Sequence, residues 1–124
     1  MPTYAPASPA AYKQQSILTA PPERLVVMLY DGALRFLFQA GAAMRDDQIA
    51  LSDEKLRRAE AIVDHLLGTL DMSAGEIASN LEGIYVFCKR LLMESRLDRD
   101  AGKIDKVREL LGELRESWAQ IAGA

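Results

Sequence analysis

The chain has 124 residues, of which 49% are hydrophobic and 27% charged, a composition typical of one soluble domain with its own core. Fifteen Lys and Arg residues against eighteen Asp and Glu give a net charge of -3, which argues against nucleic acid or an anionic membrane as the main partner. A single cysteine, Cys88, excludes an internal disulfide framework, and no signal peptide or membrane-spanning run is apparent. We therefore expect a cytoplasmic protein without membrane insertion.

Residues 1–21 differ from the rest of the chain in composition. All five prolines lie at or before residue 22, among Ala, Ser, Gln and Thr, which predicts a flexible Pro/Ala-rich N-terminal arm. The arm carries one short apolar group, too small to fold alone but able to dock on a surface: Tyr12, Ile17 and Leu18.

Four amphipathic segments follow, and they predict an all-α fold, an antiparallel four-helix bundle over residues 22–124. The first covers residues 22–46 and the second residues 52–70, with Ser52 as its cap. The third begins with a capping box of Ser73 and Glu76, and Gly102 marks the break before the fourth. The expected inward stripes, in chain order, are Val26, Leu29, Ala33, Phe36, Ala40 and Ala43; Leu56, Ala59, Val63, Leu66 and Leu70; Ile77, Leu81, Ile84, Cys88, Leu91 and Ser95; and Ile104, Val107, Leu111, Leu114, Trp118 and Ile121.

The first and third segments carry more hydrophobic side chains than their inward stripes need. Residues such as Val27 and Phe38, or Val86 and Met93, fall at outward or flanking positions. Three interpretations are open: the assumed helical phase is wrong by one residue, the protein is a homodimer, or the surface is a groove for amphipathic helices of another protein.

The sequence shows no catalytic or metal-binding motif, so we expect neither enzymatic activity nor a cofactor or metal. The one histidine, His65, falls outside the inward stripe of its helix. Bundles of this length include histidine phosphotransfer domains, which need an exposed histidine on a helix. The following Leu66-Leu67-Gly68 supplies no cation for a phosphoryl group, which favours an ordinary surface histidine. Phosphotransfer through His65 stays an alternative.

An ordered set of segments extends over roughly residues 12–118. It consists of Tyr12, residues 17–20, residues 22–25, residues 28–33 (Met-Leu-Tyr-Asp-Gly-Ala), Ala59, Ile62, Val63, Leu66, residues 70–71, residues 75–78, Asn80, Leu81, Ile84, Tyr85, Leu111, Leu114, Arg115 and Trp118. This set resembles the FliS family of flagellar secretion chaperones. Two positions depart from the family pattern: Pro21-Pro22 stands where Ser-Pro is usual, and Ser95-Arg96 where Ala-Asn is frequent.

The resemblance implies a non-enzymatic bundle that binds the C-terminal segment of flagellin in the cytosol. It further implies that binding prevents premature polymerisation and aids delivery to the flagellar export gate. The protein would be a monomer or a weak homodimer, and a self-associating helical domain is a further alternative. The residues expected to contact the partner are Tyr12, Ile17, Leu18, Val27, Tyr30, Leu34, Phe38, Tyr85, Val86, Leu92 and Met93; for Tyr30 and Tyr85, core packing is an equal alternative.

Overall fold

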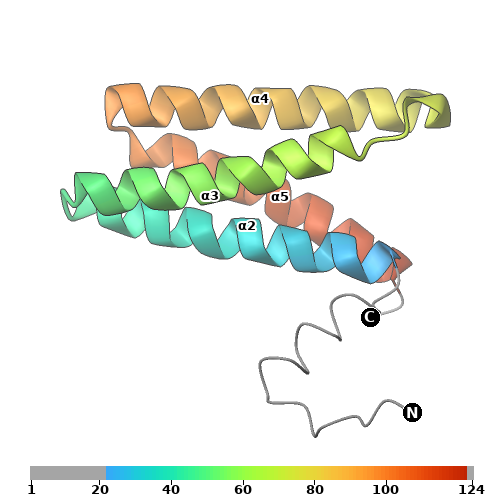
Figure 1. Ribbon diagram of the computed structural model, residues 1–124, viewed down its shortest axis with the longest axis horizontal. Helices are drawn as coiled ribbons and strands as arrows, with labels where there is room; N and C mark the ends of the chain where they lie inside the picture. Colours follow the sequence, from blue (N-terminus) through green and yellow to red (C-terminus); the bar gives the residue numbers. More distant parts are fainter. Residues whose placement is uncertain (1–21, 123–124) are drawn as a thin grey trace, which may run out of the picture.

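The computed structural model describes residues 22–122, which form a bundle of four long helices without strands (Figure 1). The helices are α2 (Pro22–Arg45), α3 (Ile49–Gly68), α4 (Glu76–Asp98) and α5 (Ala101–Ile121). A short 3-10 helix, η1 (Met72–Ala74), leads into α4. The all-α four-helix prediction is confirmed, whereas the predicted arm, residues 1–21, lies outside the described residues.

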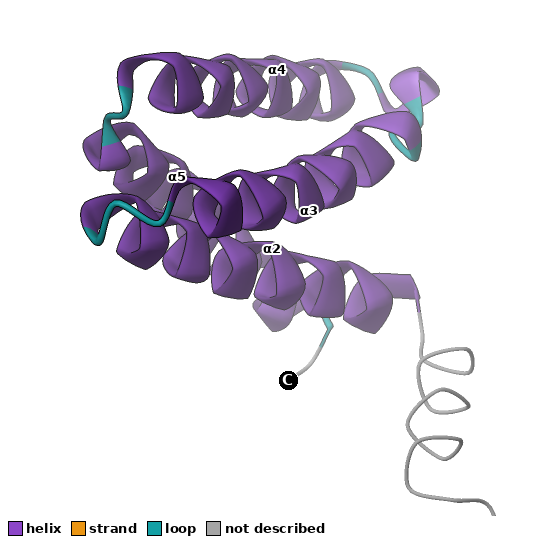
Figure 2. Ribbon diagram, turned by 60° about the vertical axis from the view of Figure 1, so that its left-hand side comes forward, coloured by secondary structure: helices purple, strands orange, loops and turns teal. Residues whose placement is uncertain are grey.

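Helices α2 and α4 occupy opposite corners of the bundle. Each of them packs against both α3 and α5, which lie between them in Figure 1 and Figure 2. Short connections join consecutive helices, so that neighbours in sequence are antiparallel neighbours in space. The outward sides of α2 and α4 therefore face different directions and do not line one groove.

One continuous hydrophobic core fills the space between the four helices. Small residues of α2 let the neighbouring helices approach closely: a Cβ at Gly32 would lie 3.3 Å from Ile62 Cδ1 of α3, and one at Gly41 would lie 3.8 Å from Ile104 Cγ2 of α5. The core consists of Tyr30, Ala33, Leu37, Ala40, Leu56, Ala59, Val63, Leu66, Tyr85, Cys88, Leu92, Ile104, Val107 and Leu111.

The buried face of α2 and of α4 lies about one residue away from the predicted stripe. Val27 is buried in α2 and Leu92 in α4, so their expected outward or flanking placement is wrong. Tyr30 and Tyr85 are buried as well, which is the core-packing alternative stated for them. The two helices are apolar around most of their circumference, and periodicity alone then leaves the phase undetermined. On α3 the predicted stripe is buried from Leu56 to Leu66, as expected from its simpler pattern.

The predicted caps of α3 and α4 are also wrong. Ser52 lies inside α3, which begins at Ile49, and its buried hydroxyl has no hydrogen-bond partner among the described residues. Ser73 lies in η1, where its N–H donates to the Asp71 carboxylate over 3.0 Å. At the other corner Asp100 caps α5 by accepting the Gly102 N–H over 2.9 Å. Aspartate thus replaces serine as the capping residue at η1, and it also opens α5.

Within residues 22–122, α2 is the one helix long and apolar enough to cross a membrane by length and composition. Seven of its residues are buried against α3 and α5, among them Tyr30 and Leu37. Its hydrophobicity is therefore accounted for by its place in the core.

Candidate partner-binding site

A row of apolar side chains follows the seam between α4 and α5. On α4, Ile77, Ile84 and Leu91 are spaced by seven residues and so share one side of the helix. Ile84 and Leu91 are half-buried against the core, and Ile77 is 71% exposed. These residues, with the α5 residues described next, are called the α4–α5 groove: Ile77, Ile84, Leu91, Leu110, Leu114 and Ile121.

A lysine near the start of α5 shows which side of this helix faces α4. Lys103 Nζ lies 2.9 Å from Asp98 Oδ2 and 3.8 Å from Glu94 Oε1, so this side of α5 faces α4. Leu110 follows Lys103 by seven residues and shares its side of the helix. Leu114 and Ile121 continue the row, and Ile121 is 65% exposed.

Ion pairs cross two of the other seams but not this groove. Between α3 and α4, Lys89 pairs with Asp64 over 2.6 Å. Between α2 and α5, Arg115 pairs with Asp31 over 2.8 Å. Among the described residues, the contacts of Lys103 are the only ion pairs between α4 and α5, and they lie at the closed corner. Over the rest of the seam, no ion pair joins the described parts of α4 and α5.

Next to the groove, at the end of the bundle where α4 begins, lies an open apolar cavity of about 290 Å³. Ile77 belongs to both, and Trp118 of α5 and Tyr85 of α4 stand in the cavity wall. All four helices and η1 contribute to the wall. This end cavity is lined by Val26, Leu66, Thr69, Leu70, Asp71, Ala74, Ile77, Ala78, Leu81, Tyr85 and Trp118.

A pair of buried tyrosines stands beside the end cavity. The Tyr30 and Tyr85 hydroxyls are hydrogen-bonded to each other across the bundle, joining α2 to α4. Burial raises the pKa of both phenols above their ordinary value, so both stay neutral at physiological pH. One turn further along α4, burial raises the pKa of the Cys88 thiol to about 11. This thiol is therefore protonated and unreactive, a core residue rather than a nucleophile.

Asp71 supplies the one charged side chain in the cavity lining. Hydrogen bonds from the Ser73 hydroxyl and backbone N–H hold the pKa of the Asp71 carboxyl below its usual range. The rim of the end cavity therefore carries a negative charge, while the residues of the wall are apolar apart from Thr69, the Tyr85 hydroxyl and the Trp118 indole N–H.

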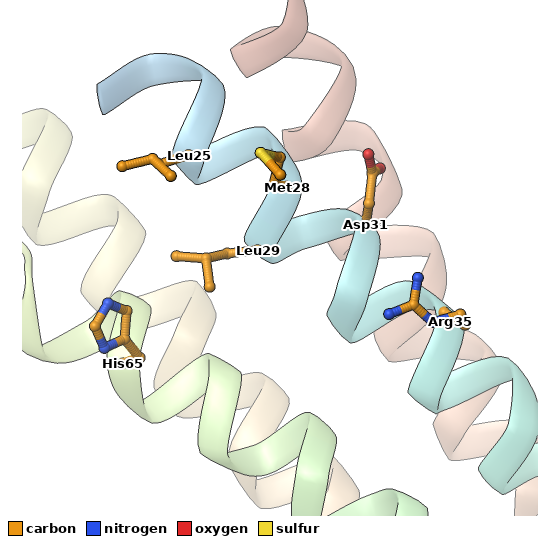
Figure 3. A pocket seen from close by; sticks show the side chains of 6 residues that line it. All are labelled: Leu25, Met28, Leu29, Asp31, Arg35 and His65. Carbon is orange, nitrogen blue, oxygen red and sulfur yellow. The ribbon is translucent and has the colours of Figure 1, made fainter. Parts of the chain in front are cut away.

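A second hollow, of about 520 Å³, lies on the outer surface between α2 and α3. Figure 3 shows Leu25 and Leu29 of α2 pointing toward α3, where His65 stands. Asp31 and Arg35 complete the rim with opposite charges. His65 is exposed, as predicted, and Arg35 is the one permanent cation among the lining residues. The lining of this hollow is more polar than that of the end cavity, because it includes Asp31, Arg35 and His65.

The structure divides the predicted partner-binding residues among several places. Phe38 is exposed on α2 beneath the Arg108 guanidinium, 5.1 Å from the ring centroid, and Leu34 is half-buried. Val86 and Met93 are exposed on α4, on the flank near α3 where Met93 adjoins Lys89. The residues in the core are Val27, Tyr30, Tyr85 and Leu92. Those outside the described residues are Tyr12, Ile17 and Leu18.

The sequence prediction missed the groove because it assigned the groove residues to the core. Ile77, Ile84 and Leu91 were placed on the inward stripe of α4, and Leu114 and Ile121 on that of α5. The seven-residue spacing was visible, but it does not reveal which side of a broad apolar face meets the partner helix. The end cavity had no local signal, because five separate elements form it.

In the part of the chain that the structure describes, no group of three or more His, Cys, Asp or Glu residues is placed to hold a metal ion.

Comparison with known proteins identifies the family. The family model described as "Flagellar protein FliS" matches residues 4–124. The flagellar secretion chaperone FliS of Bacillus subtilis is 31% identical over 110 residues, covering 89% of this chain and 82% of the relative. That of Salmonella typhimurium is 34% identical over 111 residues, covering 88% and 82%. The flagellar secretion chaperone FliSB of Pseudomonas aeruginosa is 33% identical over 124 residues, covering 96% and 98%.

These matches extend over nearly the whole chain. The chain belongs to the FliS family of flagellar secretion chaperones.

Proposed function

We propose that this protein binds the C-terminal segment of flagellin in the cytosol, keeps flagellin from polymerising early, and presents it to the flagellar export gate. The α4–α5 groove and the end cavity form the docking surface. The observation that carries the proposal is the row of apolar side chains from Leu91 to Ile77, the last of which also lines the end cavity, with no ion pair between α4 and α5 beyond Lys103 among the described residues.

The dimensions of the groove suit an amphipathic helix. From Ile77 to Leu91 the groove follows fourteen residue steps of α4, a length of about 21 Å at 1.5 Å per residue. A partner helix of about four turns would cover it, with apolar side chains at i, i+3, i+4 and i+7 against the groove. A segment that is unfolded before assembly would order on this surface and bury apolar area in doing so.

Apolar residues outside the groove are candidates for additional contacts with a long client segment. Phe38 on α2, and Val86 and Met93 on α4, are exposed on other flanks of the bundle. We propose that the groove provides the main contact, because its residue Ile77 also lines the apolar end cavity. The protein then acts as a monomer whose apolar path is covered by the client rather than by a second copy.

Calorimetric titration with the C-terminal segment of the organism's own flagellin tests the proposal. We expect saturable one-to-one binding with a negative heat-capacity change. Trp118 is the only tryptophan in the chain and lines the end cavity, so its fluorescence should change as a tryptophan-free segment binds. The absence of binding at tens of micromolar would contradict the proposal.

A matched pair of variants on α4 locates the site. Ile77 is 71% exposed in the groove, and Leu97 is 73% exposed on another side of the same helix. Ile77→Gln should weaken binding about tenfold or more, since a buried isoleucine contributes about 1.5–3 kcal/mol. Leu97→Gln should leave the affinity unchanged, and both variants should unfold like the parent. Equal effects of the two substitutions would place the client elsewhere.

A further inference from the structure

The hydrogen bond between Tyr30 and Tyr85 leaves one hydroxyl proton without an acceptor. Each phenol carries one proton, and a single bond between the two oxygens uses only one of them. Among residues 22–122, the one other side-chain group that interacts with either hydroxyl is the Trp118 indole N–H, which faces the Tyr30 oxygen and, being a donor, cannot accept the second proton. The remaining proton must therefore point either into the core or into the end cavity.

Burial decides which tyrosine holds the remaining proton. Tyr30 is 0% exposed and does not line the end cavity, whereas Tyr85 is 2% exposed and stands in its wall. If Tyr85 donated to Tyr30, the Tyr30 proton would be buried without an acceptor, which is unfavourable. If Tyr30 donates to Tyr85, the free proton belongs to Tyr85 and can be satisfied from the cavity. The second arrangement is the stable one.

The cavity lining also restricts what can accept this proton. None of its eleven residues is a cation, and Asp71 at the rim is an anion. A carboxylate entering the cavity would lose its hydration, gain no counter-charge and meet the charge of Asp71. A neutral carbonyl oxygen would lose little and would gain the hydrogen bond, while the groups around it pack against the apolar wall.

We propose that the end cavity is a subsite for a part of the client that is apolar except for one neutral carbonyl oxygen, which accepts a hydrogen bond from the Tyr85 hydroxyl. The carbonyl belongs to the backbone at the end of a bound helix or to an Asn or Gln side chain. This inference rests on the proposed function, since it concerns the same client, and it names the chemistry that the cavity selects.

Two single substitutions distinguish an effect on client affinity from an effect on the stability of the fold. Tyr85→Phe and Tyr30→Phe both remove the bond between the hydroxyls, so both should lower the urea midpoint of unfolding. Only Tyr85→Phe removes the donor that faces the cavity. In titrations with the flagellin C-terminal segment, Tyr85→Phe should weaken binding about five- to tenfold, the size expected for one hydrogen bond. Tyr30→Phe should change the affinity less than about twofold, because Tyr85 still donates.

The double variant Tyr30→Phe/Tyr85→Phe completes the test. It leaves no orphaned hydroxyl, so its stability should recover relative to Tyr85→Phe, while its affinity should stay as low as that of Tyr85→Phe. Parent-like affinity of Tyr85→Phe, or equal losses of affinity in both single variants, would overturn the inference while leaving the proposed function standing. Failure of the parent protein to bind would instead overturn the proposed function.

Discussion

Leu92 and Met93 are adjacent in α4, yet they lie in opposite environments. Leu92 is fully buried, and Met93 is 50% exposed. We expect Leu92→Ala to lower the free energy of unfolding by about 2–5 kcal/mol through the cavity that it leaves. Met93→Ala should change it by less than about 0.5 kcal/mol. Urea denaturation followed by circular dichroism measures both, and a larger effect at Met93 would mean that the helical phase described above is wrong.

Leu92 and Met93 also show how far the sequence can predict the burial of single residues. The apolar character of both was evident, but their order of burial was not, because Tyr85, Val86 and Phe87 make the preceding turn of α4 apolar all round as well. Packing against α3 and α5 settles the phase, and that information lies in other helices.

The buried thiol and phenols make the fold sensitive to alkali. Burial raises the pKa of Cys88 from 9.0 to about 11, and it raises the pKa of Tyr30 and Tyr85 as well. A raised pKa means that the folded state holds its proton longer than the unfolded state. Stability is therefore complete below pH 9 and falls as the pH rises toward 11 and beyond.

Cys88→Ala tests this dependence. The loss of unfolding free energy between pH 8.5 and pH 10.5 should be smaller in the variant than in the parent by on the order of 1–2 kcal/mol, whatever the difference at pH 7. Urea titrations at each pH measure it. An identical pH dependence would show that the Cys88 thiol is not desolvated as the structure has it.

At the scale of the helices, the corner between α4 and α5 contains a residue in an unfavourable conformation. Arg99, at the end of α4, has φ 56° and ψ 41°, the left-handed region that favours glycine. We expect Arg99→Gly to raise the free energy of unfolding by about 0.5–1 kcal/mol. Arg99→Ala, which keeps the strain and removes the charge, is the control in the same thermal or urea unfolding measurement. A stability loss in Arg99→Gly would contradict this account.

The helices themselves were predictable, whereas their ends and seams were not. Gly102 marked the α4–α5 corner because it lies two residues after the Asp100 cap, in the first turn of α5. Ser52 and Ser73 are good capping residues by propensity, but Ser52 is buried inside α3 and Asp71 provides the cap near Ser73. The preference of serine for a capping position is overridden by packing where the chain can continue the helix for another turn.

At the scale of the whole molecule, the first part of α4 is held less firmly than the rest of the bundle. Its first ion pair to a neighbouring helix among the described residues is formed by Lys89, so residues 76–84 depend on apolar contacts beside the end cavity. Their amides should exchange with solvent faster than those of the α2 centre around Leu37. Hydrogen exchange should slow at residues 76–84 when the flagellin segment binds. Equal protection along α4 in the free protein would contradict this expectation.

The seam that the partner would use could not be chosen from the sequence. The order and length of the four helices follow from periodicity and glycine positions, but the diagonal relation of α2 and α4 arises from the assembled bundle. Apolar residues on those two helices therefore suggested one groove, whereas the bundle leaves α4 beside α5. The ion pairs that close the α3–α4 and α2–α5 seams, such as Arg115 with Asp31, are visible only in three dimensions.

The apolar row on α4 and α5 follows the helix axes, and this would affect how a client bound to it as proposed leaves it. A chain drawn from one end would detach one helical turn at a time, so each step breaks the contact of one or two side chains rather than the whole interface. The same interface resists shear, because sliding along the axis must disturb every turn together. Unloading by peeling therefore needs little force at any moment, even from an interface that is stable at equilibrium.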